Sequence, residues 1–336
     1  MSNALLVRND GQILFARFGV RLANTVSGGA VIPPQFSVII TCHDQAVFIQ
    51  DAVNSAFAQD YKAREVIVVD DASSDGSVDI LKAFGNSLRL ISAPKNIGAN
   101  AARNLGASIA GGDYLVFLDG DDLLLPWALR TYKAVISATQ APILLGRLLF
   151  FEGAQRPESE EIPTEITFVE YENLIEKDRT YRASASATVV KRTTFHQVGG
   201  WTEGLFHLDD LDIMMKLGVS GRCVQILSPA STCYRVHEGN TVRQVSSFVP
   251  AMLTLIKKEK AGEYPGGARF RYKRYAFLGG PISFWIKRCL RARLYANANS
   301  LVIKGWVMAF AAAMRRFSVK LSSGVPPRTL PMSGSD

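Results

Sequence analysis

The chain has 336 residues, of which 48% are hydrophobic and 20% charged, and its formal net charge at pH 7 is +8. This length suits one large α/β domain with an appendage, or two domains, and the composition excludes an intrinsically disordered chain. None of the four cysteines forms a Cys-x-x-Cys pair, which favours reduced thiols over a small disulfide scaffold.

Polar residues at Arg8, Asn9 and Asp10 interrupt the first apolar run, so we expect no secretory signal peptide. No apolar stretch reaches the roughly 18 residues that a membrane-spanning helix needs. These features predict a cytoplasmic protein, and the charge distribution leaves peripheral attachment to the inner face of the membrane open.

The basic charge is concentrated near the C-terminus. Between Lys257 and Lys320 there are 15 Lys and Arg residues and two acids, a local charge of +13 that leaves −5 for the rest of the chain. This asymmetry favours an acidic partner, either an anionic membrane or, as a weaker idea, a nucleic acid. Aromatic residues such as Trp306 and Phe310 lie among the basic ones, as in helices at a membrane interface. Helices packed on the main domain with a solvated basic face are an equal alternative.

Apolar strands and helices alternate from residue 36 onward. Short apolar runs predict strands at 36–40, 65–69, 88–91 and 114–118, and helical spacing predicts helices at 46–58, 78–84 and 99–110. Farther along, the sequence predicts strands at 187–190 and 223–227 and a helix that begins near His207. Alternating elements predict an α/β fold with a mostly parallel central sheet, whose ligands bind beyond the carboxyl ends of the strands.

We divide the chain into four regions. An N-terminal arm covers 1–35, an α/β domain covers 36–244, a basic helical extension covers 245–321, and a disordered tail covers 322–336. The tail is small, polar and rich in proline, which is the basis for expecting disorder.

Three carboxylates, Asp119, Asp121 and Asp122, directly follow the predicted strand 114–118. Like charges this close raise one another's pKa unless a cation lies among them. A hard divalent ion resolves the conflict because it binds one or two carboxylates and completes its shell with phosphate oxygens and water. A solvated acidic turn is the simpler alternative, and the polar clusters after the neighbouring strands argue against it.

Two further polar clusters follow strands or begin helices. Asp71 is placed to accept a hydrogen bond from a base or a ribose hydroxyl, while Asp75 or Ser74 caps the next helix. Arg103 lies just over one helical turn past Gly98, where a guanidinium can meet a phosphate or a nucleoside. An ordinary surface arginine is the alternative.

The predicted helix near His207 begins with Asp209, Asp210 and Asp212. A carboxylate at a helix N-terminus tends to stay ionised, as a general base must. We select Asp210 for that role and expect capping roles for the other two. His237 is a candidate metal or phosphate ligand, although a lone histidine is more often structural.

Taken in this order, the motifs resemble those of the family 2 glycosyltransferases, which have the GT-A fold. The resemblance covers Phe36 to Thr241 and rests on these segments: 38–44, 68–76, 96–104, 118–122, 199–201 and 209–210. It implies a GT-A-like nucleotide-binding sandwich with a donor-binding half at 36–125 and an acceptor half at 126–244.

The resemblance implies a role for each matching residue. Thr41 and Asp71 would contact the nucleotide base, Arg103 the nucleotide, and Asp119 the ribose side of the donor. The implied substrate is a nucleoside-diphosphate sugar.

The same resemblance implies the catalytic groups. Asp121 would ligate a divalent metal, Mn²⁺ or Mg²⁺, and His237 would reach the metal or the phosphates. Asp210 would be the base of a single inverting displacement onto a hydroxyl of a glycan or lipid-linked acceptor, in polysaccharide or glycolipid assembly. A nucleotidyltransferase or a nucleotide-sugar-binding module without transfer activity are the alternatives.

The chain departs from the family pattern at several positions. Thr41, His43 and Asp44 replace the usual Pro, Tyr and Asn of the first motif. Asp209 replaces a Glu that is one methylene longer, and Lys216 stands where the family often has Arg. These departures bear on the identity of the substrates more than on activity.

Overall fold

The computed structural model describes residues 35–62, 64–153, 162–176, 184–237, 245–321 and 326–332, and side chains only as far as residue 317 in the last helix. The predicted N-terminal arm therefore lies outside the described residues, apart from Gln35.

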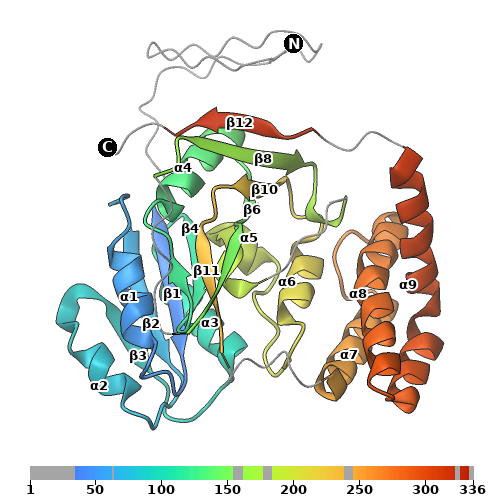
Figure 1. Ribbon diagram of the computed structural model, residues 1–336, viewed down its shortest axis with the longest axis horizontal. Coiled ribbons are helices and arrows are strands. Elements are labelled where there is room, and N and C mark those ends of the chain that lie inside the picture. The colour runs from blue at the N-terminus through green and yellow to red at the C-terminus, as the bar shows by residue number, and fades with distance from the viewer. Residues whose placement is uncertain are drawn as a thin grey trace.

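A nine-stranded sheet crosses the centre of the molecule in the order β12-β8-β10-β6-β9-β4-β1-β2-β3 (Figure 1). Its strands are β1 (Phe36–Cys42), β2 (Arg64–Asp70), β3 (Arg89–Ser92), β4 (Tyr114–Asp119), β6 (Ile143–Leu145), β8 (Glu165–Tyr171), β9 (Thr188–Lys191), β10 (Cys223–Ser228) and β12 (Arg328–Pro331). A second sheet has the order β5-β11-β7, formed by β5 (Leu123–Leu124), β11 (Thr232–Val236) and β7 (Leu148–Glu152).

The first half of the large sheet is parallel and the second half is mixed. Strands β4, β1, β2 and β3 are parallel neighbours, which confirms the prediction from the first four apolar runs. Beyond them, β9 is antiparallel to β4 and β6, and β8 is antiparallel to β10 and β12, whereas β6 and β10 are parallel. Antiparallel pairs do not need the long crossovers of parallel ones, and β6, β7, β8 and β9 follow one another here with no α-helix between them in the described part of the chain.

Helices cover both faces of the sheet. One face carries α1 (Ile49–Phe57), α2 (Ser77–Lys82) and α4 (Ala128–Thr139), and the other carries α3 (Ala99–Ile109), α5 (Arg192–Gln197) and α6 (Asp209–Leu217). The alternation of side chains along β1 explains the two cores, because Val38 and Ile40 join the first and Ile39 joins the second.

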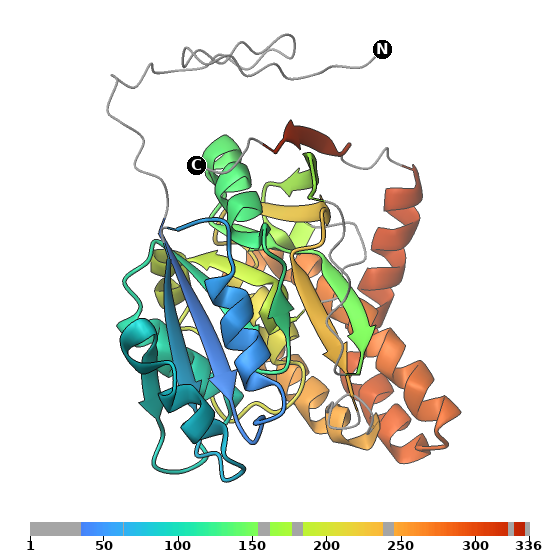
Figure 2. The same cartoon turned by 60° about the vertical axis from the view of Figure 1, so that its left-hand side comes forward.

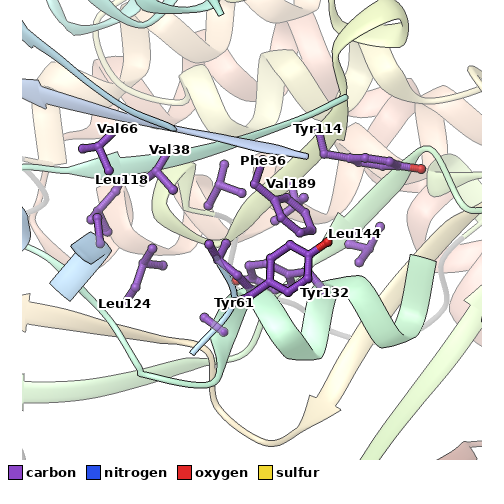
Figure 3. Close-up of a cluster of buried hydrophobic side chains, with 14 of the residues drawn as sticks. Phe36, Val38, Tyr61, Val66, Tyr114, Leu118, Leu124, Tyr132, Leu144 and Val189 are labelled. Carbon is purple, nitrogen blue, oxygen red and sulfur yellow. The ribbon is translucent and has the colours of Figure 1, made fainter. Parts of the chain in front are cut away.

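The first core is the larger of these two. Figure 3 shows Val38 of β1 in one cluster with Tyr132 from α4 and Leu144 from β6. Tyr132 and Leu144 have no solvent exposure. This packing fixes the sheet on which the polar ends of β1, β2 and β4 are carried.

Three helices form the C-terminal region, which confirms the predicted helical extension. They are α7 (Phe248–Ala261), α8 (Arg271–Arg291) and α9 (Tyr295–Leu321), grouped at the end of the molecule farthest from β3 (Figures 1 and 2). None of the helices in the described part of the chain is long and apolar enough to cross a membrane.

The prediction of a disordered tail is wrong for residues 328–331. They form β12, which pairs antiparallel with β8 at the edge of the sheet. Leu330 is only 7% exposed, and the Arg328 guanidinium lies 2.7 Å from a Glu170 carboxylate oxygen. A sheet edge offers unpaired backbone groups to any nearby segment, and a tail's own composition does not reveal that partner.

Helices α8 and α9 touch at a glycine. A Cβ on Gly279 would lie 1.8 Å from the backbone oxygen of Met308, whereas nothing lies within 4 Å of a Cβ on Gly280. We predict that Gly279→Ala lowers the free energy of unfolding by about 1–3 kcal/mol through overpacking. Gly280→Ala is the matched control and should be neutral or stabilising by up to about 1 kcal/mol. Urea denaturation of both variants measures the difference, and equal effects would contradict the close contact.

Candidate active site

The predicted donor-site residues lie at one edge of the sheet because β1, β2 and β4 end together. Thr41 is in register with Asp119, and Cys42 is in register with Asp70. The carboxyl ends of these parallel strands therefore bring Thr41, Asp71 and Asp119 to the same edge, as the sequence predicted.

The glycine of the acidic motif makes the approach to β1 possible. A Cβ on Gly120 would lie 2.8 Å from the Thr41 backbone oxygen and 2.4 Å from the Gln45 Oε1 atom. The Gly120 N–H donates to the Thr41 backbone oxygen at 2.9 Å. Any side chain at this position would displace the two carboxylates beside it.

Asp122 anchors the motif from within the protein. Its carboxylate is 1% exposed and accepts hydrogen bonds from the Ser186 hydroxyl at 2.5 Å and the Arg235 backbone N–H at 2.9 Å. Burial, together with the charges of Asp121 and Asp119, raises the pKa of Asp122 well above its usual range. Of the three acids, this one faces the interior rather than a ligand.

Asp121 and His237, the two predicted metal ligands, lie side by side. The His237 Nε2 atom is 2.8 Å from the Asp121 Oδ2 atom, and their side chains are 23% and 15% exposed. Burial and the charge of Asp119 raise the pKa of Asp121. Among the described residues, no group of three or more His, Cys, Asp and Glu side chains forms a metal cage. Such a donor pair fits an ion that takes its remaining ligands from phosphate and water.

Arg235 supports this pair and was not singled out from the sequence. Its side chain is 1% exposed and lies between the rings of Phe48 and Phe151, at 4.8 and 4.6 Å from their centroids. Its Nε atom donates to the Asp121 backbone oxygen at 2.9 Å. No local pattern in the sequence links Arg235 to the acidic motif, because 114 positions separate it from Asp121.

Arg103 connects the acidic motif to α6. Its guanidinium is 5% exposed and lies 2.7 Å from an Asp119 oxygen and 2.9 Å from an Asp209 oxygen. Burial disfavours its charge, but Asp119 and Asp209 outweigh burial and raise the pKa of Arg103. The alternative of an ordinary surface arginine is therefore wrong. Its predicted nucleotide contact stays a prediction, because the guanidinium here bonds protein carboxylates.

Asn100 and Asn104, on the same helix as Arg103, hold the loop before α6. The Asn104 amide bonds both the N–H and the carbonyl of Trp201, each at 2.9 Å. The Asn100 amide donates to the carbonyls of Thr202 and Leu205, each at 3.0 Å. From the sequence, we interpret segment 96–104 as a nucleotide-binding motif. In the structure it also holds the loop that leads to Asp210.

Asp210 lies in the first turn of α6, after two residues in a left-handed conformation. His207 has a φ of 64° and Leu208 a φ of 55°, which is unusual for residues other than glycine and is found at functional sites. Burial and the charges of Asp209 and Asp119 raise the pKa of Asp210 well above its usual range, against the opposing effect of Arg103. The buried Asp210 Oδ1 atom has no hydrogen-bond partner within the described part of the chain.

The loop after β2 is held by its own acids. The Asp71 carboxylate accepts hydrogen bonds from the N–H groups of Ile97 and Gly98 at 2.6 and 2.8 Å, so it orders the segment before α3. The Asp75 carboxylate accepts a hydrogen bond from the Ser77 N–H, the first N–H of α2, at 3.0 Å, while the N-cap position itself is Gly76. A contact between Asp71 and a nucleotide base stays a prediction.

Comparison with known proteins now identifies the domain. The model of "Glycosyl transferase family 2" matches residues 37–198. The chain therefore contains a family 2 glycosyltransferase domain. The match includes the acidic motif after β4 and ends before α6.

Among curated relatives, glycosyltransferase GlyG of Streptococcus pneumoniae is 29% identical over 113 residues, which are 33% of this chain and 38% of the relative. The succinoglycan biosynthesis protein ExoO of Rhizobium meliloti is 25% identical over 327 residues, 90% of this chain and 93% of the relative. The alignments with the first three curated relatives span 38%, 38% and 25% of their own lengths.

Solved structures show the same fold. Staphylococcus aureus TarS residues 1–349, crystallised with UDP-GlcNAc, superposes with a TM-score of 0.62 at 19% identity. The superposition covers 90% of this chain and 100% of the TarS chain. The GT-A type of fold, predicted from the order of motifs, is thereby confirmed.

We predict that Asp210→Asn stabilises the protein at neutral pH. The pKa of Asp210 is raised in the folded protein, so ionisation favours the unfolded chain. The two proteins should be equally stable below the usual aspartate pKa. As the pH rises from there towards the raised pKa, the free energy of unfolding of the wild type should fall below that of Asp210→Asn.

Urea unfolding with a chelator, from about pH 4 to about pH 8, measures this difference. Asp79→Asn is the control, because Asp79 is 87% exposed, and it should follow the wild-type profile. A pH-independent difference between wild type and Asp210→Asn would contradict the assignment of the shift to Asp210.

Proposed function

We propose that the chain is an inverting, metal-assisted glycosyltransferase that moves a sugar from a nucleoside-diphosphate sugar to a hydroxyl of a glycan or lipid-linked acceptor. The observation that carries the proposal is the unpartnered Asp210 Oδ1 atom. Arg103 joins the start of its helix to Asp119 of the acidic motif. A base and a donor site are thus held in one network.

The donor occupies the edge where β1, β2 and β4 end in this proposal. Thr41 and Asp71 contact the base, and Asp119 contacts the ribose side. Arg103 acts on the nucleotide directly or through Asp119, which it holds at 2.7 Å. Uridine is the favoured base, because TarS of the same fold has been crystallised with UDP and with UDP-GlcNAc.

Asp121 and His237 hold a divalent ion, Mn²⁺ or Mg²⁺, in this proposal. A carboxylate suits either ion, and the imidazole beside it is more compatible with Mn²⁺. When bound, the ion supplies positive charge that stabilises the departing diphosphate. The raised pKa of Asp121 supports a cation site, because a positive charge there would relieve the conflict with Asp119.

Asp210 acts as the general base. Its carboxylate removes the proton of the acceptor hydroxyl while that oxygen bonds to the anomeric carbon of the donor. The bond between that carbon and the diphosphate oxygen breaks on the opposite side, so the configuration inverts. A raised pKa brings the base closer to the operating pH, where proton transfer is efficient.

Nucleotide binding is the first test. We predict that one nucleoside diphosphate raises the melting temperature in the presence of Mn²⁺, because binding to the folded state alone adds about 2.7 kcal/mol to the free energy of unfolding at about 100 times its Kd. Asp121→Ala should lose the metal-dependent part, because it removes a carboxylate ligand. A panel of nucleotides and nucleotide sugars, with and without Mn²⁺, identifies the donor by its thermal shift.

Asp210→Asn is the matched control for this experiment. It should keep the nucleotide-dependent shift and lose transfer or donor hydrolysis by about 10²–10⁴-fold. Full activity in Asp210→Asn would contradict the role of the base. An absence of any shift in folded wild-type protein would favour a module with another ligand.

We also propose that α9 contacts an anionic membrane surface. One side of the helix packs inward through residues that are at most 5% exposed, and these are Leu301, Met308, Ala311 and Ala312. The opposite side exposes large apolar residues, and these are Val302, Ile303, Trp306, Val307, Phe310 and Phe317. A helix with this arrangement can lie in a membrane interface with its apolar stripe buried.

The charge around this stripe favours anionic lipid. No Asp or Glu occurs between Glu263 and Asp336, and Lys304 and Arg316 are exposed on the same helix. Each basic residue near such a surface contributes about 1 kcal/mol, screened by salt. The predicted basic extension thus both packs on the main domain and presents an apolar face.

We predict that the full chain sediments with phosphatidylglycerol-containing vesicles and not with neutral phosphatidylcholine vesicles. The double variant Trp306→Ser, Phe310→Ser should bind about tenfold more weakly, because it removes two large apolar contacts. Tyr272→Ser, which changes an exposed aromatic residue on α8, is the control. Self-association through the stripe, with no lipid binding, would contradict the proposal.

A further inference from the structure

Helix α6, which carries Asp210, is shared between two hydrophobic cores. Ile213 and Leu217 pack into the core beneath the large sheet. Leu211 and Met215 pack into a separate core formed with α7 and α8. The helix of the base is therefore held from one side by the glycosyltransferase fold and from the other by the C-terminal helices.

Three stacked rings connect His207, two residues before α6, to the C-terminal helices. The imidazole of His207 lies 4.2 Å from the Phe248 ring centroid at an interplanar angle of 29°. Phe248, at the start of α7, lies 4.3 Å from Trp285 of α8 at 17°. His207 is three positions before Asp210, so the stack bears directly on the turn that presents the base.

A buried carboxylate makes a second connection. Asp212 has no solvent exposure and accepts hydrogen bonds from the Tyr264 hydroxyl at 2.7 Å and the Thr202 hydroxyl at 2.6 Å. The Lys258 ammonium of α7 also donates to it. Removing either partner of such a buried pair leaves an uncompensated charge.

The two connections flank a strained backbone. His207 and Leu208 both adopt positive φ angles, a conformation that persists only where the surroundings hold it. The ring stack holds the first of these residues, and the buried Asp212 lies two residues past Asp210. Asp210 lies between the two fixed points.

We propose that the C-terminal helices and the connection between α7 and α8 are part of the catalytic site: Phe248 and Trp285 fix His207, Lys258 and Tyr264 fix Asp212, and together they position Asp210. His207 is in this sense a positioning residue and touches no substrate. The kinetic consequence rests on the proposed function of Asp210 as base. The structural consequence, an ordered 207–212 turn, does not.

The test removes the ring while keeping the backbone conformation. Asn tolerates a left-handed φ, so His207→Asn loses the stack without adding strain, and His207→Phe restores a ring. With UDP-GlcNAc and Mn²⁺, or with the nucleotide sugar that gives the largest thermal shift, we expect kcat for donor turnover to fall about tenfold in His207→Asn. KM for the donor should stay within about twofold, and His207→Phe should recover most of kcat.

Hydrogen–deuterium exchange on the full chain gives a readout that needs no substrate. The amides of residues 207–212 should exchange faster in His207→Asn and in Phe248→Ala than in the wild type. Phe284→Ala is the control, because Phe284 contacts Trp285 edge-on at 5.5 Å but lies outside the stack and is 54% exposed.

Wild-type kcat and wild-type exchange in His207→Asn would overturn the proposal. Faster exchange without any nucleotide binding in the wild type would support the positioning role and refute the proposed function instead. If Phe248→Ala does not fold, the His207→Asn and His207→Phe pair still decides the question.

Discussion

Repulsion among carboxylates at the end of β4 is the constraint on which the rest of the site depends. Asp119, Asp121 and Asp122 follow one strand, and Asp210 is close enough to feel Asp119. Two buried guanidinium groups oppose this charge from within the protein. Arg103 bonds Asp119, and Arg235 bonds the Asp121 carbonyl. The pKa values of Asp121, Asp122 and Asp210 remain raised all the same, because burial acts together with the repulsion between the carboxylates.

The negative charge that remains at the end of β4 favours the binding of a cation. A site that holds excess carboxylate charge in a partly buried edge is poised for a cation and for a substrate that brings one. Diphosphate alone would be repelled, whereas a metal–diphosphate complex would be attracted. In the proposed function, the electrostatic cost of gathering these carboxylates and the affinity for a metal–diphosphate substrate would be two aspects of one arrangement.

Much of this arrangement was predictable from sequence because it depends on local order. Strands β1 to β4 are recognisable in the sequence as short apolar runs. The polar residues that follow them must meet at one edge of the sheet because the strands are parallel. The pairing of Asp121 with His237 was expected only from the family resemblance, since 116 positions separate them. Long-range partners such as Arg235, and the two asparagines of α3 that hold the loop before α6, have no local signature.

The second half of the sheet and the C-terminal region were harder to predict for a related reason. Mixed pairing leaves no regular rhythm of strand and helix, and the strand at Arg328–Pro331 is specified by its partner β8 rather than by its own composition. The exposed stripe of α9 illustrates the same limit. Sequence shows that apolar and basic residues alternate there, but not which face is covered.

After the three C-terminal helices, the chain returns to the large sheet, where β12 pairs with β8. These helices are therefore not a terminal appendage. They are inserted between β11 and β12 of the α/β fold, so both of their ends are anchored in it. A segment tied at both ends can tilt or slide but cannot swing away as a hinged appendage does. A chain that ended after α9 would release one anchor and leave the outer edge of β8 open for pairing with another strand.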